Sequence, residues 1–149
     1  AGAAPIIAVD FDGVLCENKW PDIGEPNFEI ISYLLAEKIK GTKLIFWSCR
    51  SKDSLKKALD WCEEKGLTFD AVNENLPEPI EAFGGDTRKI YADEYIDDKM
   101  CKRFELPFKP TKSFIYEMKC SPFSNTNVAN TEEYYKRIMN ALHINDRGL

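Results

Sequence analysis

Runs of apolar residues without alternation mark the strands expected in this chain. The first, "IIAV" at residues 6–9, leads directly into Asp10. Such a run is typical of a strand that is covered on both faces, as in a parallel sheet. The run "LIFW" at residues 44–47 repeats the pattern, and shorter strand-like pieces follow at residues 67–73 and 94–97. These segments predict a buried sheet.

Three other segments carry apolar residues at helical spacing. The predicted helices span residues 26–41, 51–66 and 131–144. Pro26 suits a first helical turn, Gly41 and Gly66 suit helix ends, and Asn130 with Glu133 resembles a capping box. The expected inner faces are, in chain order, Phe28, Ile31, Leu34, Leu35 and Ile39, then Leu55, Ala58, Leu59 and Cys62, then Tyr135, Ile138, Met139 and Leu142.

The order of these segments predicts the fold class. Strands and helices alternate along residues 6–97, which favours a three-layer, Rossmann-like α/β domain with a mostly parallel central sheet. Residues 14–26 and 74–86 read as loops, and residues 113–118 as a strand-like piece. We expect residues 1–109 to form a catalytic core and residues 110–149 a C-terminal extension packed on the same domain.

Polar side chains follow three of the predicted strands. Because the carboxyl ends of parallel strands meet at one edge of the sheet, these side chains are expected to share a site. They are Asp10 and Asp12, Ser48 and Arg50, and Asp97 and Asp98. Residues i and i+2 of an extended segment point to the same side, so two acids in "DFD" would repel unless a cation lies between them. Mg²⁺ is the simplest such ion.

Each of these residues also has a structural interpretation. The acids of "DFD" can be solvated turn residues, and Ser48 or Ser51 can cap the following helix. Ser48 can otherwise donate to a phosphate oxygen, with a charge-assisted contact from Arg50. Lys89 can neutralise a nucleophile and a bound phosphate, or can simply be solvated; Arg88 is its rival for the same role.

Taken in order, the motifs "IIAVDFDGV", "LIFWS", Lys89 and "YIDD" resemble those of the haloacid dehalogenase-like superfamily of phosphohydrolases. The resemblance implies that Asp10 is a nucleophile that forms an aspartyl phosphate, and that Asp12 is the general acid and base. It also implies Mg²⁺ ligation by Asp10, the backbone carbonyl of Asp12 and Asp97, with support from Asp98. Ser48 and Lys89 would hold the phosphoryl oxygens.

Members of this superfamily often carry an inserted cap domain. Here the segments at residues 14–26 and 73–88 are too short for one, so the chain resembles the small, capless members. The open site could take a macromolecular substrate, or be covered by a partner or a second copy in a homo-oligomer. Residues 16–26 could form a small flap that carries Trp20, whose alternative is to pack on the base of its own loop.

Composition narrows the function further. The net charge of −5 and pI of about 5.0 argue against general binding to nucleic acid or to anionic membranes. Neither a secretory signal nor an apolar stretch long enough to span a membrane is visible. Five cysteines without a CxxC motif, and a single histidine, His143, favour reduced thiols and a cytoplasmic location over a zinc site.

We therefore expect a Mg²⁺-dependent phosphomonoesterase. Two alternatives are a phospho-accepting, receiver-like module and a weakly catalytic binding module on the same fold. A nucleotide or the end of a nucleic acid is conceivable as substrate, with Trp20, Trp47 and Phe83 as stacking residues. These aromatic residues are more often part of a core.

Overall fold

The computed structural model describes residues 3–100 and 128–146. Its centre is a sheet of strands β1 (Ile6–Val9), β4 (Lys43–Phe46), β5 (Ala71–Val72) and β6 (Glu94–Ile96). The strand order is β5-β4-β1-β6, and each neighbouring pair is parallel. The fold is thus the predicted Rossmann-like α/β domain, in which β1 lies between β4 and β6.

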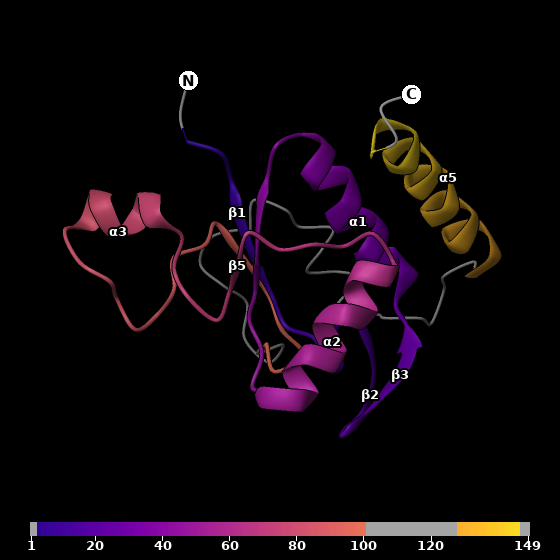
Figure 1. Ribbon diagram of the computed structural model, residues 1–149, viewed down its shortest axis with the longest axis horizontal. Helices are drawn as coiled ribbons and strands as arrows, with labels where there is room; N and C mark the ends of the chain where they lie inside the picture. Colours follow the sequence, from indigo (N-terminus) through magenta and orange to yellow (C-terminus); the bar gives the residue numbers. More distant parts are fainter. Residues whose placement is uncertain (1–2, 101–127, 147–149) are drawn as a thin grey trace.

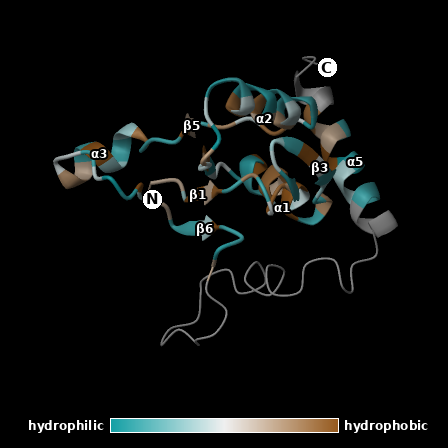
Figure 2. Ribbon diagram, turned by 90° about the horizontal axis from the view of Figure 1, so that it is seen from below, coloured by the Kyte–Doolittle hydropathy of each residue, from teal (hydrophilic) through white to brown (hydrophobic). Residues whose placement is uncertain are grey.

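Both faces of the sheet are covered. Since successive residues of a strand point to opposite faces, each strand contributes side chains to both buried clusters. Ile7 and Val9 of β1 pack in one buried cluster, whereas Ile6 and Ala8 pack in another. Helices α1 (Phe28–Ile39), α2 (Lys52–Glu64) and α5 (Val128–Asp146) lie on the first side, and α3 (Pro77–Phe83) lies on the second (Figure 2). This placement explains why the strands are apolar without alternation.

The predicted ends of α2 agree with the structure, whereas the start of α1 does not. Ser51 precedes α2 and exchanges hydrogen bonds with Ser54, while Gly66 follows the helix with a φ of +81°. Helix α1 begins after Asn27, whose side chain accepts the N–H of Ile30. Pro26 instead ends a strand, so its predicted place in the first helical turn was wrong.

Two segments predicted as loops contain regular structure. Residues 14–26 hold the antiparallel hairpin of β2 (Cys16–Lys19) and β3 (Asp22–Pro26). The hairpin escaped prediction because most of β2 is exposed and carries no apolar pattern. Residues 74–86 hold α3, which is too short to show helical periodicity, although Pro77 and the left-handed Gly84 mark its two ends.

Helix α5 packs against α1 and contributes Ile138 and Met139 to the same buried cluster. The Tyr135 ring lies 4.7 Å from that of Phe28, as the predicted apolar face requires. The helix begins at Val128, so the backbone of Asn130 lies inside the helix and not at the N-cap position that the predicted capping box requires. The strand-like piece at 113–118 lies outside the described residues. Within the described part of the chain, no helix is long and apolar enough to cross a membrane.

No cap domain is inserted into residues 3–100. Between β1 and α1 the chain forms only the turn after Asp10 and the β2–β3 hairpin, and between β5 and β6 it forms only α3 and its connections. Figure 1 shows the hairpin at the lower side of the domain, toward which β1 runs from the N-terminus. Of these insertions, only the β2–β3 hairpin therefore borders the carboxyl edge of the sheet.

The described cysteines are free thiols. Cys16 and Cys62 are buried and Cys49 is exposed, while Cys101 and Cys120 lie outside the described residues. Burial raises the pKa of Cys16 to about 11 and that of Cys62 to about 12. Both thiols therefore remain protonated at neutral pH, which makes them packing residues and not nucleophiles.

Candidate functional site

Three carboxylates meet at the carboxyl edge of the sheet. One oxygen from each of Asp10, Asp97 and Asp98 lies within 4.8 Å of the others. The parallel pairing of β1 with β6 brings them together, and the N–H of Asp10 donates to the carbonyl of Ile96 at 2.9 Å. We call these residues the acid cluster. The predicted convergence of the first and last acidic motifs is therefore present in the fold.

The glycine after "DFD" makes room for this cluster. Gly13 has a φ of +82°, and a Cβ added there would lie only 2.5 Å from Oδ2 of Asp98. A side chain at this position would meet both the strain of a left-handed backbone and the Asp98 carboxylate. Glycine thus allows the turn after β1 to lie directly against Asp98.

The electrostatics of the cluster are unfavourable to three ionised acids. Burial, together with the negative charges of Asp97 and Asp98, raises the pKa of Asp10 to about 7, although the N–H of Phe11 donates to its Oδ1 at 2.7 Å and opposes the rise. A divalent cation would relieve this repulsion. The donor set consists of carboxylate oxygens, which are the ligands that Mg²⁺ prefers. The residues present therefore fit a magnesium site.

Asp12 does not join the acid cluster. Its Oδ2 accepts the Nε–H of Arg50 and its Oδ1 accepts an Nη2–H, each at 2.8 Å. The expectation that a cation lies between the carboxylates of Asp10 and Asp12 is therefore not met. The rule for residues i and i+2 fails because the extended backbone ends here: Asp12 pairs with Cys16 in an isolated bridge at the start of the turn. Ligation through the backbone carbonyl of Asp12 stays a prediction.

Arg50 directs all five of its N–H donors to groups within the protein. Besides the two bonds to Asp12, Nη2 donates to the Asp22 carbonyl at 2.9 Å, and Nη1 donates to the carbonyls of Pro21 and Ser54, each at 3.3 Å. Its side chain is only 1% exposed. Because a guanidinium has five N–H groups, Arg50 offers none to a phosphate in this arrangement. The predicted phosphate contact of Arg50 is corrected accordingly.

Ser48 lies at the end of β4 and is half-buried. Its N–H donates to Oδ1 of Asn73 at 2.8 Å, and its Oγ accepts the N–H of Arg50 at 3.1 Å. Asn73 follows β5 with a φ of +55°, a conformation that asparagine tolerates well. Sequence reasoning missed Asn73. A polar residue at the end of the third predicted strand, at the same edge of the sheet, was the available signal.

The two candidate cations of the third motif lie on the exposed segment that precedes β6. The Lys89 ammonium lies 5.2 Å from the centre of the Tyr95 ring, and both Lys89 and Arg88 are exposed. Within the described part of the chain, no ion pair joins either residue to Asp10, Asp97 or Asp98. The role of Lys89 in binding phosphate, with Arg88 as the alternative, therefore stays a prediction.

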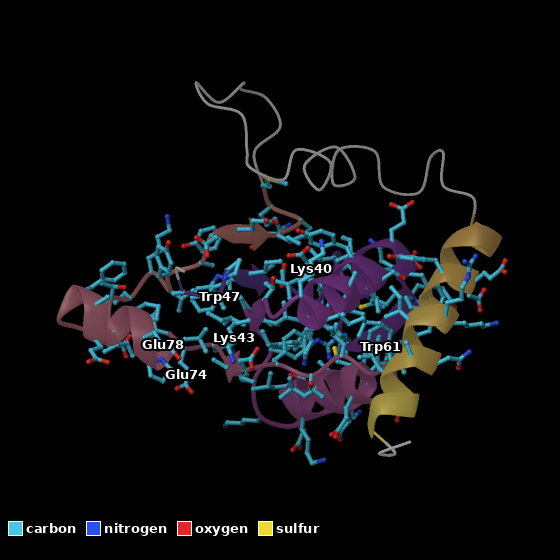
Figure 3. All side chains as sticks on the ribbon, turned by 90° about the horizontal axis from the view of Figure 1, so that it is seen from above. Lys40, Lys43, Trp47, Trp61, Glu74 and Glu78 are labelled. Atoms are coloured by element: carbon cyan, nitrogen blue, oxygen red, sulfur yellow. The ribbon has the colours of Figure 1, made fainter. Side chains whose placement is uncertain are left out.

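The three aromatic residues considered for stacking have different surroundings. Trp20 lies between β2 and β3, is 57% exposed, and has the Arg50 guanidinium 5.0 Å from its ring. Trp47 is half-buried and packs on the α3 side of the sheet, whereas Trp61 lies near α5 on the other side (Figure 3). Phe83 is exposed in α3 and contacts Tyr91. Only Trp20 is linked to the site residues by these contacts.

The fold and the acid cluster together define an α/β domain with a candidate metal site at the carboxyl edge of its sheet. A solved structure of a conserved protein coded by a locus from Bacteroides thetaiotaomicron is similar to this chain, with 35% sequence identity and a TM-score of 0.61. The match covers 80% of this chain and 92% of that one. The chain therefore belongs to the same family as that Bacteroides protein. Comparisons with family models and with curated proteins gave no match.

Proposed function

We propose that the protein is a Mg²⁺-dependent phosphomonoesterase of the haloacid dehalogenase-like type. The observation that carries this proposal is the acid cluster, which places Asp10 of the central strand beside Asp97 and Asp98. Asp10, Asp97 and Asp98 would hold the ion. When bound, Mg²⁺ supplies positive charge that keeps Asp10 ionised and offsets the charge of the substrate phosphate.

In the first step, a carboxylate oxygen of Asp10 attacks the phosphorus atom, and the bond between phosphorus and the leaving oxygen breaks. Oδ1 of Asp10 accepts the Phe11 N–H, so Oδ2 is the better candidate for the attacking atom. Asp12 gives a proton to the leaving oxygen. The products of this step are the free alcohol or phenol and an aspartyl phosphate on Asp10.

In the second step, water attacks the phosphorus atom of the aspartyl phosphate. Asp12, now a carboxylate, takes a proton from that water, and the bond between phosphorus and Asp10 breaks. Inorganic phosphate leaves, and Asp10 returns to its carboxylate form. One acid thus serves both proton transfers, which agrees with the absence of histidine from residues 3–100.

Ser48 and Lys89 are proposed to bind the phosphoryl oxygens. The Ser48 hydroxyl accepts one backbone bond, which leaves its proton available for a phosphate oxygen, and Asn73 holds the Ser48 backbone in place. Lys89 has a flexible four-carbon side chain on an exposed segment, so its ammonium can leave the Tyr95 ring when an anion binds. Positioning and charge neutralisation are the main requirements of this reaction.

Because no cap domain is inserted between residues 3 and 100, the site is open, and we propose that it can accept large substrates as well as small ones. A screen of phosphorylated metabolites, nucleotides and DNA with 3′ or 5′ phosphate ends would identify the class. We expect one of these classes to be hydrolysed faster than a generic aryl phosphate, because contacts beyond the phosphate add binding energy to the transition state.

Hydrolysis of 4-nitrophenyl phosphate by the purified chain tests the proposal. Release of nitrophenol and phosphate should require Mg²⁺ and should stop when EDTA removes the metal. Phosphate release that is unchanged by EDTA would contradict the magnesium site. A stable phosphoprotein without turnover would favour a receiver-like module instead.

A further inference from the structure

Arg50 is the most completely bonded side chain near the site, although it touches none of the three clustered acids in the contacts described. Its two bonds to Asp12 form a parallel fork, which fixes both the position and the plane of the carboxylate. A single hydrogen bond would leave the carboxylate free to twist. The geometry therefore gives Asp12 one defined orientation.

The fork does not use up the hydrogen-bonding capacity of Asp12. A carboxylate has about four acceptor positions, and Arg50 occupies two of them. A remaining position can accept a proton and later give it away while the pair persists. The Asp12 side chain is 17% exposed, against 1% for Arg50, so the acid faces accessible space and the guanidinium lies behind it.

The remaining donors of Arg50 tie this pair to the β2–β3 hairpin and to α2. They reach the carbonyls of Pro21 and Asp22 in the hairpin and that of Ser54 in α2. The Phe11 and Trp20 rings each lie 5.0 Å from the guanidinium carbon. Phe11 is fully buried whereas Trp20 is 57% exposed, so Arg50 makes one cation–π contact in the core and one at the surface.

We propose that Arg50 is a positioning residue for Asp12: it fixes the plane of the carboxylate that transfers protons and connects that carboxylate to the hairpin bearing Trp20. This inference rests on the proposed function, because it concerns the proton transfers assigned to Asp12. It predicts that loss of Arg50 slows the first phosphoryl transfer most for substrates whose leaving oxygen needs a proton.

Two aryl phosphates separate this role from a merely structural one. Phenolate is a poor leaving group that needs a proton, whereas 2,4-dinitrophenolate leaves readily without one. Arg50→Lys keeps the charge but cannot form the fork. We compare kcat/KM, because it reports the first phosphoryl transfer and not the hydrolysis of the aspartyl phosphate that both substrates share. We expect Arg50→Lys to lower kcat/KM on phenyl phosphate by about 10²-fold, within the range for general acid–base catalysis, and on 2,4-dinitrophenyl phosphate by less than about 10-fold.

Asp12→Asn serves as the reference, since it should show the same selective loss. Arg50→Ala with added guanidinium ion is a second test, and the ion should restore the reaction of phenyl phosphate more than that of 2,4-dinitrophenyl phosphate. Equal losses on both substrates, or no loss, would overturn the inference while leaving the proposed function intact. Failure of the wild-type chain to hydrolyse either substrate would overturn both.

Trp20→Ala decides the matter if the Arg50 variants do not fold. It retains every hydrogen bond of Arg50 to Asp12 and removes one ring, so we expect the same selectivity at about 2–5-fold, the equivalent of one exposed cation–π contact. Phe83→Ala is the matched control, because Phe83 is 58% exposed and lies in α3. A Trp20→Ala variant with equal or no change on the two substrates would overturn the inference.

Discussion

The acid cluster and the single carboxylate of Asp12 lie at the same edge of the sheet and differ in what balances their charge. The acid cluster of Asp10, Asp97 and Asp98 brings three acids together, and burial and repulsion raise the pKa of Asp10. Asp12, two residues further on, is paired with a guanidinium through two short bonds. Neighbouring acids of one motif thus meet opposite environments, and only the cluster calls for a metal ion.

The largest effect should follow from the loss of the nucleophile. Asp10→Asn keeps the shape of the side chain but removes its nucleophilic oxygen, so hydrolysis of 4-nitrophenyl phosphate should fall by more than about 10⁴-fold, beyond the range of a lost acid–base group. Asp60→Asn is the control, because Asp60 is an exposed acid whose ion pair within the described part of the chain is with Lys56. An Asp10→Asn variant of unchanged activity would contradict the mechanism.

The Asp12–Arg50 pair should matter most for stability. Arg50→Leu removes the bonds that Arg50 donates to Asp12 and to three backbone carbonyls, so we expect the free energy of unfolding to fall by about 3 kcal/mol or more, as for other broken buried pairs. Urea unfolding measures this change. The exposed Arg88, replaced by Leu, should alter stability by no more than about 0.5 kcal/mol. Similar losses of stability for Arg50→Leu and Arg88→Leu would contradict the claim that the Asp12–Arg50 pair stabilises the fold.

The acid cluster should make the metal-free protein less stable as pH rises. The pKa of Asp10 is about 7 in the folded chain against an ordinary 3.8, so between these values the folded state binds the proton more tightly than the unfolded state. Stability from this group is complete below pH 3.8 and is lost by about pH 7. We expect a loss of about 1–2 kcal/mol, because partial exposure reduces the effect.

Thermal unfolding at several pH values checks this slope. Asp10→Asn should be flatter than the wild type between pH 4 and about 7, where the Asp10 carboxyl changes its charge. Mg²⁺ should stabilise the wild type more at pH 8 than at pH 5, since only the ionised cluster binds a cation well. Equal stabilisation at the two pH values would argue against binding at these acids.

The smallest effect concerns one member of the cluster. Asp98→Asn removes a negative charge beside Asp10, so the metal-free protein at pH 8 should gain up to about 1 kcal/mol of stability while losing the stabilisation by Mg²⁺. Calorimetric titration with Mg²⁺ measures the second change directly. Asp60→Asn should bind Mg²⁺ as the wild type does.

Sequence patterns predicted the parts of this molecule that depend on burial. The runs at residues 6–9 and 44–47 are apolar throughout because both faces of the sheet are covered, and so their place in a buried sheet and their common edge could be predicted. The face of α5 formed by Tyr135, Ile138, Met139 and Leu142 was predictable for the same reason. The pattern of apolar residues indicates which side chains are buried, and burial is what defines these strands and this helix face.

What sequence could not provide is the partner of each polar group. Arg50 stands two residues from Ser48 and was expected to bind phosphate, but it binds Asp12 and two carbonyls of the hairpin, whose exposed strands gave no apolar signal. The direction of Asp12 depends on where the extended backbone ends, which the letters "DFDG" do not specify. Asn73 supports Ser48 across two strands, a contact set by the sheet order.

The central claim is that Asp10 carries the phosphoryl group during turnover. Acid quenching of the wild-type chain with substrate and Mg²⁺, followed by borohydride, reduces an aspartyl phosphate to homoserine, which peptide mass spectrometry can locate. The account predicts homoserine at position 10, dependent on both substrate and Mg²⁺. Steady hydrolysis with aspartate alone at position 10, or with homoserine elsewhere in the chain, would contradict it.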